Sequence, residues 1–148
     1  LAPAVHLRRS PNTQLLLAAA LQIEEGSSEA IPRCGAGRIG VINGTSTSSI
    51  DEASESMAGW LRERTFPDDY AYRQQELGAP ANFLAAWLQL SGPAYAIATA
   101  CTSSPRALPS AVRAPYMGLC DAVLCGGVDP LVRLALQAVS ALRPNSPH

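Results

Sequence analysis

The sequence predicts an α/β fold in which a mainly parallel sheet is flanked by helices. Three short apolar runs, over residues 38–43, 94–99 and 122–128, have the length and composition of buried strands. Segments with helical spacing separate these runs along the chain. Strands that are joined through helices pair in parallel, because the chain has to cross the sheet between them. We find neither an internal repeat nor a low-complexity linker, so we expect a single domain.

The helices are placed by their start and stop signals. Ser10, followed by a proline, predicts the N-cap of a helix over residues 11–25. Ser49 and Glu52 have the spacing of a capping box, and the apolar positions that follow them keep helical spacing. Two further helical segments are predicted, over residues 70–77 and 82–90.

The composition favours a globular protein and excludes some partners. Hydrophobic residues make up 47% of the 148 residues, and the net charge is −1. Such a balance offers no electrostatic surface for nucleic acid or an anionic membrane. No apolar run reaches the roughly 18 residues of a membrane span. Four cysteines without a secretory signal favour a reducing compartment, so we expect a cytoplasmic protein.

Two motifs that suggest a ligand have unsuitable positions. Residues 35–40 match G-x-G-x-x-G, but they precede a predicted strand, whereas a dinucleotide site needs these glycines after a strand. We therefore expect a plain turn. Cys120 and Cys125 lie five positions apart, and odd spacing on a strand sends side chains to opposite faces. We expect no metal site and no bound cofactor.

Cys101 is the candidate nucleophile. It lies where the apolar run 94–99 passes through Ala100 into a helix-like stretch. Backbone N–H groups and the helix dipole at such a junction favour the thiolate, which is the nucleophilic form. The same groups, the N–H of Cys101 included, can stabilise the oxyanion formed when a thioester carbonyl is attacked. The plainer alternative is a small buried cysteine beside helix-capping hydroxyl groups, and the local residues alone favour it.

Three segments of the chain, in order, resemble motifs of one enzyme family. Residues 38–46 resemble R-x-G-V-x-x-G-[TS], and residues 118–129 resemble G-x-x-D-x-x-x-x-G-G. Between them, residues 92–104 resemble a nucleophile segment with T-A-C-[ST]-S after a strand. The family is the β-ketoacyl-acyl-carrier-protein synthases. The resemblance covers about residues 10–136, and it identifies the chain, residues 1–148, as a partial N-terminal domain. It implies the N-terminal half of a thiolase-like fold, truncated at both ends.

The resemblance implies acyltransferase chemistry centred on Cys101. An acyl group passes from an acyl carrier protein to this thiol, and a decarboxylative Claisen condensation with a malonyl thioester follows. This chemistry serves fatty-acid or polyketide biosynthesis. The implied partners are the carrier protein and a homodimer mate or the missing C-terminal half. No cofactor is implied, because the phosphopantetheine belongs to the carrier.

The same resemblance implies that this chain is incompetent alone. The family's two histidines and its lysine lie in the second half of the fold. His6 and His148 match neither histidine position, and the chain contains no lysine. Two alternatives stay open: a non-catalytic thiolase-fold interaction module and a degenerate fragment.

The prolines after Cys101 favour a degenerate fragment. Pro105, Pro109 and Pro115 fall where the family has one continuous helix. An interior proline removes a helix hydrogen bond and crowds the preceding turn. We therefore predict a kink or break near Leu108, or a helix that starts later, with weakened support for the Cys101 turn.

Overall fold

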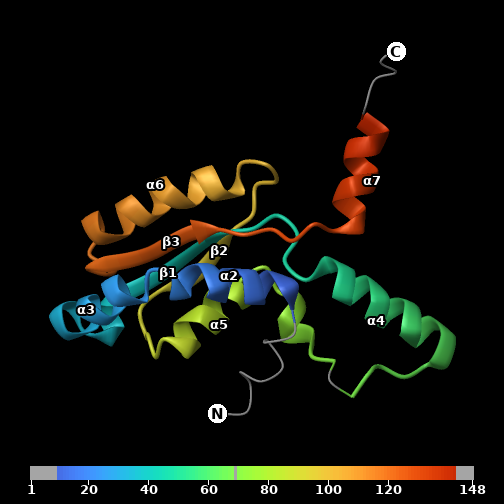
Figure 1. The fold of residues 1–148 in the computed structure, drawn as a ribbon, viewed down its shortest axis with the longest axis horizontal. Helices are drawn as coiled ribbons and strands as arrows, with labels where there is room; N and C mark the ends of the chain where they lie inside the picture. Colours follow the sequence, from blue (N-terminus) through green and yellow to red (C-terminus); the bar gives the residue numbers. More distant parts are fainter. Residues whose placement is uncertain (1–9, 69, 143–148) are drawn as a thin grey trace.

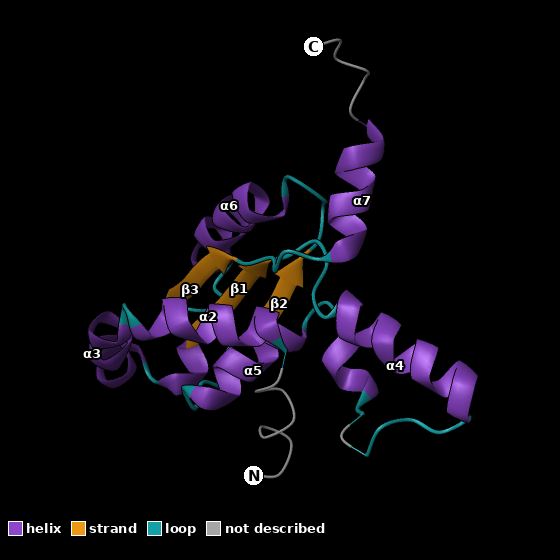
Figure 2. Cartoon of the chain, turned by 45° about the vertical axis from the view of Figure 1, so that its right-hand side comes forward, coloured by secondary structure: helices purple, strands orange, loops and turns teal. Residues whose placement is uncertain are grey.

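The sheet has three parallel strands in the order β2-β1-β3. The computed structural model describes residues 10–68 and 70–142. Within this part of the chain the strands are β1 (Ile39–Gly44), β2 (Ala94–Ile97) and β3 (Ala122–Gly127). Both pairings are parallel, as predicted, and the central strand β1 is buried along its whole length (Figures 1 and 2).

Helices cover both faces of the sheet (Figure 2). Helices α2 (Pro11–Leu21) and α5 (Ala79–Trp87) contribute to a core cluster with Val41, whereas α6 (Ser103–Tyr116) packs on Ile42. Successive side chains of a strand point to opposite faces, so β1 feeds both clusters. The predicted arrangement of helices flanking a parallel sheet is therefore confirmed.

The first predicted helix is wrong in its C-terminal part. The helix α2 ends at Leu21, and α3 (Glu24–Cys34) begins after a two-residue break. The N–H groups of Gln22 and Ile23 donate to carbonyls three residues back, which tightens the last turn and ends the α-helix. The last two residues of the predicted helix, Glu24 and Glu25, belong to α3 instead.

The connection between β1 and α5 holds α4 (Ile50–Glu63) and a 3₁₀ turn, η2 (Tyr72–Gln75). Ser49 precedes α4 as predicted, but its side chain makes no capping bond. Its hydroxyl lies 2.6 Å from the hydroxyl of Ser10 instead, which ties this end of α4 to the start of α2. The predicted helix over residues 70–77 is only the turn η2. At the other end of the chain, α7 (Arg133–Leu142) projects away from the sheet (Figure 1).

The predicted break in α6 is wrong. The helix runs without interruption from Ser103 to Tyr116 and contains Pro109 and Pro115. Its inner face, with the alanines Ala107, Ala111 and Ala114, packs on the sheet, whereas the three prolines are exposed. A carbonyl that loses its helix partner on the exposed face can bond water, which reduces the cost of an interior proline. Packing of the inner face on the sheet outweighs the cost that remains.

The two motifs that suggested a ligand, the glycines at residues 35–40 and the pair Cys120 and Cys125, have structural positions. Gly35 precedes a 3₁₀ turn, η1 (Ala36–Arg38), which contains Gly37 and leads into β1, so the predicted turn is confirmed. The prediction that Cys120 and Cys125 point to opposite faces is wrong. Cys120 precedes β3 rather than lying on it, and both thiols pack in the cluster under α6.

None of the described helices combines the length and apolar character that a membrane crossing requires.

Candidate active site

The first and third sequence motifs meet at the amino ends of β1 and β3. The Arg38 guanidinium donates to both carboxylate oxygens of Asp121, over 3.1 and 2.5 Å, and to the Gly118 carbonyl over 2.9 Å. These hydrogen bonds lower the pKa of Asp121 and raise that of Arg38. The motif residues at this end therefore align the two strands.

At the carboxyl ends of the same strands, a pair of glycines makes room for the start of α6. Gly44 and Gly127 are register partners on β1 and β3. A Cβ on Gly44 would lie 2.5 Å from the backbone nitrogen of Ser104 and 2.6 Å from the carbonyl of Ser103. A Cβ on Gly127 would collide with the Ser104 side chain. Only residues without a side chain allow the helix to approach this closely.

Cys101 lies in the tight turn that connects β2 to this helix. Ala100 adopts a left-handed conformation with φ 53°, which reverses the chain. The buried hydroxyl of Ser103 accepts a hydrogen bond from the Thr99 N–H at 2.9 Å and donates to the Ala100 carbonyl at 2.6 Å. The Thr102 hydroxyl donates to the Thr99 carbonyl at 2.8 Å. The hydroxyl groups beside Cys101 therefore fix the shape of its turn.

The side chain of Cys101 is exposed, unlike that of a packing cysteine. This excludes the plainer alternative of a buried thiol. Cys120 is buried, and Cys34 and Cys125 are partly buried. Burial raises the pKa of the Cys120 and Cys125 thiols, so both favour the unreactive protonated form. Accessibility thus sets Cys101 apart from the other three thiols.

Asp129 connects the loop after β3 to the loop after β1. Its carboxylate accepts hydrogen bonds from the hydroxyls of Thr45, Ser46 and Thr47, at 2.8, 2.9 and 3.2 Å. The N–H groups of Ser46 and Thr47 also donate to it, at 2.7 and 3.1 Å. Burial by itself would raise the pKa of Asp129, but these hydrogen bonds outweigh it and the pKa is lowered.

The Thr45 hydroxyl extends this network toward α2, because it also accepts a hydrogen bond from the Asn12 amide at 3.1 Å. The Thr45 N–H donates to the Ile97 carbonyl at the end of β2 over 3.1 Å. Asp129 therefore restrains the edge of the sheet from which the Cys101 turn starts.

The sequence indicated Cys101 as the candidate nucleophile but indicated no role for Asp129 or for the pair Gly44 and Gly127. The available signal was the end of each strand, since the carboxyl ends of parallel strands meet at one edge. A run of hydroxyl residues follows β1 and an aspartate follows β3. Among the described residues, no group of three or more metal-binding side chains is arranged to hold an ion.

Comparison with known proteins decides the family. A family model described as the N-terminal domain of beta-ketoacyl synthase matches residues 3–148. The chain belongs to the β-ketoacyl synthase family. The three strands of its sheet thus carry the three β-ketoacyl synthase motifs, and the turn after β2, within the middle motif, holds Cys101.

Relatives of this β-ketoacyl synthase domain include much longer proteins. The polyketide synthase ThaG of Burkholderia thailandensis is 34% identical over 131 residues, which are 87% of this chain and 2% of ThaG. Nodulation protein E of Rhizobium meliloti is 41% identical over 61 residues, which are 40% of this chain and 15% of that protein. The chain therefore spans a small part of each relative.

Solved ketosynthase structures share the fold. A chain of the complex of the ketosynthase ApeO with its chain length factor ApeC, from Xenorhabdus doucetiae, matches with a TM-score of 0.84 and 42% identity. The match covers 100% of the present chain and 38% of that chain. A type II polyketide synthase complex, AntDE:AntF, matches with a TM-score of 0.78 but 15% identity, over 97% of this chain and 43% of that one. The thiolase-like fold is thus confirmed for this chain.

Proposed function

We propose that Cys101 is the acyl-accepting nucleophile of a β-ketoacyl synthase in polyketide or fatty-acid biosynthesis. The observation that supports this most directly is an exposed thiol on the turn between β2 and α6, where side-chain hydroxyl groups hold the backbone through hydrogen bonds. In the sequence this thiol lies in the motif where the family has its nucleophile. Polyketide synthesis is favoured, because the relatives matched over most of this chain are polyketide synthases.

In the proposed first step, the Cys101 thiolate attacks the carbonyl carbon of an acyl thioester. The carbonyl becomes an oxyanion, which the backbone N–H of Cys101 would stabilise in part. Collapse of this intermediate breaks the bond to the carrier sulfur, which leaves as a thiolate and takes a proton from solvent. The acyl group then remains on the Cys101 sulfur.

In the proposed second step, a malonyl thioester loses carbon dioxide and its carbanion attacks the acyl carbon on Cys101. A carbon–carbon bond forms, the carbon–sulfur bond breaks, and the thiolate is regenerated. The resemblance assigns stabilisation of the carbanion to histidines in the second half of the fold. We propose that these 148 residues support acyl transfer to Cys101 but not condensation.

The proposed partner in the first step is an acyl carrier protein, whose phosphopantetheine brings the acyl group. The condensation step would need a polypeptide that supplies the second half of the fold, or a homodimer mate. The chain itself would hold no cofactor. A cytoplasmic location stays a prediction.

The first step is tested by incubating the chain with a hexanoyl thioester of N-acetylcysteamine, followed by intact mass measurement and peptide mapping. We expect one acyl group on Cys101, its loss in Cys101→Ala, and its retention in the matched variant Cys34→Ala. Equal acylation of Cys34 and Cys101 would contradict the assignment of the nucleophile. A 3-oxoacyl product after addition of a malonyl thioester would contradict the proposed need for a second half.

A further inference from the structure

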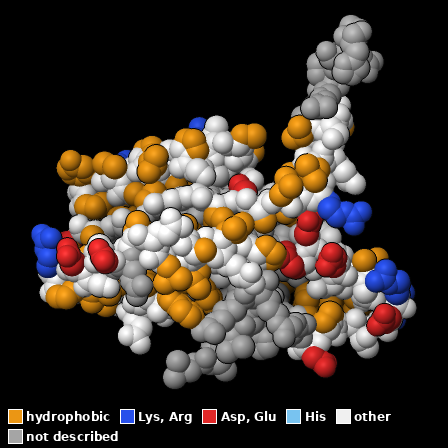
Figure 3. All heavy atoms as spheres, viewed as in Figure 1, with side chains coloured by type: hydrophobic (Ala, Val, Ile, Leu, Met, Phe, Trp, Pro, Cys, Tyr) orange, Lys and Arg blue, Asp and Glu red, His pale blue; other side chains and the backbone are white. Residues whose placement is uncertain are grey.

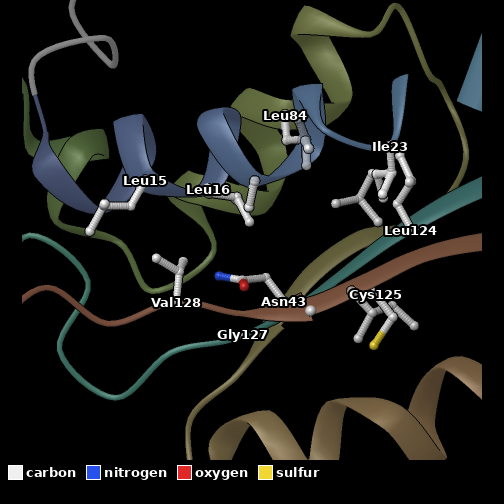
Figure 4. Close-up of a pocket in the computed structure, with 14 residues that line it drawn as sticks. Leu15, Leu16, Ile23, Asn43, Leu84, Leu124, Cys125, Gly127 and Val128 are labelled. Carbon is white, nitrogen blue, oxygen red and sulfur yellow. The ribbon is translucent and has the colours of Figure 1, made fainter. Parts of the chain in front are cut away.

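A cavity of about 130 Å³ lies between α2 and the sheet, on the face opposite to α6. Apolar side chains of α2, α5, β1 and β3 form its walls, and Leu16, Leu84 and Val128 border it in Figure 4. Leu15 and Ile23 also line it and are 50% and 54% exposed, so the cavity opens to solvent beside α2. The Cys101 turn is not part of this cavity.

Asn43 is a polar side chain in this apolar cavity. Only 1% of the residue is exposed, and neither its amide oxygen nor its amide nitrogen has a hydrogen-bond partner among the described residues. In Figure 4 the amide points from β1 toward α2, into the space beside Leu16 and Val128. A buried amide without partners costs about 1–3 kcal/mol, so a native chain that retains one calls for an explanation.

The cavity exists because β3 lacks a side chain beside Asn43. Gly126 is the register partner of Asn43, and partners on neighbouring parallel strands point to the same face. The preceding pair on this face, Val41 and Leu124, packs in the core cluster with α2 and α5. Apart from its two neighbours in the chain, no described residue has an atom within 4 Å of a Cβ built on Gly126. The missing side chain therefore leaves a space into which the amide points.

We propose that this cavity is a binding site for a small neutral molecule that has an apolar body and one hydroxyl or amide group. The apolar walls match the body, and a group that both donates and accepts can satisfy the two unpaired atoms of Asn43. The ligand is neutral because the described residues that line the cavity include no charged side chain to pair with it. Size limits it to about six to eight heavy atoms, since an apolar cavity of roughly 150 Å³ holds benzene.

Benzyl alcohol and toluene provide the test, because they differ by one hydroxyl group. Each is titrated into the 148-residue chain while amide resonances are followed by NMR. We expect benzyl alcohol to bind about threefold to tenfold more tightly than toluene, which corresponds to one net hydrogen bond. The resonances that shift should include those of Leu16, Val41 and Leu124. Equal affinity for the two probes, or hydration of Asn43 with no binding of either, would overturn the proposal.

Two variants separate the role of the amide from that of the space. Asn43→Leu replaces the amide with an apolar side chain of similar size, so it should raise the unfolding midpoint and remove the preference for benzyl alcohol. Gly126→Val fills the cavity with a residue that favours strands, and it should abolish binding of both probes. Retained binding in Gly126→Val would place the site elsewhere and overturn the proposal. Cys101→Ala should bind both probes as the parent chain does, since this site is independent of the proposed enzyme function.

Discussion

At the residue scale, residues of the same type differ in their surroundings. Four cysteines share one side chain, but they differ in exposure and hydrogen bonding, and the same holds for the aspartates. Cys101 is exposed on a turn in which the hydroxyl groups of Thr102 and Ser103 form hydrogen bonds. Cys120 is one of the least exposed residues of the described chain, at 1%. Asp129 is exposed, yet five hydrogen-bond contacts hold its carboxylate. Reactivity and acid sensitivity should follow these surroundings.

We expect iodoacetamide near pH 7 to modify Cys101 ahead of Cys34, Cys125 and Cys120. Cys101 is the exposed thiol, and burial raises the pKa of Cys120 and Cys125, which lowers their thiolate fraction at neutral pH. Peptide mapping at short reaction times measures the order. Equal labelling of the four cysteines would contradict this account of their accessibility.

Asp129→Asn should reduce the loss of stability at low pH. The pKa of Asp129 is lowered in the folded state, so its contribution is present above the unfolded value of about 3.9. That contribution is lost as the pH falls through the lower, folded value. The variant should therefore have a lower thermal unfolding midpoint than the parent protein at pH 7. Its midpoint should then fall less than that of the parent as the pH is lowered to 3. Thermal unfolding across this range measures the difference, and parallel curves for the two proteins would refute the role given to the carboxylate.

At the element scale, α6 is the helix on which the site depends. Its first residues contact the glycine pair at the ends of β1 and β3, and its inner face consists of small alanines. Two prolines lie within it without breaking it. The position of this helix is therefore set by close contact with the sheet rather than by helix propensity.

Gly44→Ala should displace the start of α6 and reduce the selective alkylation of Cys101. The added Cβ would meet backbone atoms of Ser103 and Ser104, which cannot rotate away. Overpacking of this kind costs about 1–3 kcal/mol. Gly59→Ala in α4 is the matched control, because its Cβ would meet no atom within 4 Å. The control should leave Cys101 unaffected and stabilise the helix by about 0.5–1 kcal/mol. If both variants unfold at the same midpoint, Gly44 does not determine the position of the start of α6.

Pro109→Ala should raise the stability of the domain. The alanine restores a helix hydrogen bond whose loss costs up to about 3 kcal/mol. It also removes the restriction that proline places on the unfolded chain, which reduces the gain in unfolding free energy by about 0.4–1 kcal/mol. Pro105→Ala is the control, since the first turn of a helix has no hydrogen bond to restore at that position. Urea titration measures both changes. An unchanged midpoint in Pro109→Ala would show that the helix accommodates this proline without penalty.

At the scale of the whole molecule, apolar side chains remain on the surface of a small sheet domain. Figure 3 shows hydrophobic side chains over α6 and along α7. On α6 and just after it, these side chains are 58–88% exposed and comprise Leu108, Val112, Tyr116 and Met117. Exposed apolar surface of this kind marks a partner surface or a tendency to associate.

We expect the chain to form oligomers at micromolar concentration in sedimentation velocity. Replacement of Leu108 and Val112 by lysine should weaken this association, because it places charge on the exposed face of α6. Met57→Lys is the control, since Met57 is also exposed but lies on α4. A monomer at these concentrations, or equal weakening by the control, would argue against association through α6.

The sequence by itself determined the class of the fold, and its resemblance to the family's nucleophile segment indicated Cys101 as the candidate nucleophile. Apolar runs with turn signals marked the three strands. These signals are local, because strand formation and helix starts depend on neighbours in the chain. The first helix was placed too long, since its end depends on a two-residue break that no glycine or proline marks.

Only the tertiary structure decided which distant residues support the site. The contacts of Asp129 with Thr45 span 84 positions, and Gly44 meets Ser104 across the sheet. The continuity of α6 through Pro109 and the cavity beside Asn43 likewise depend on what packs against each element. Packing brings together residues that are far apart in the sequence, and it outweighs local propensity where a helix face or a strand is buried.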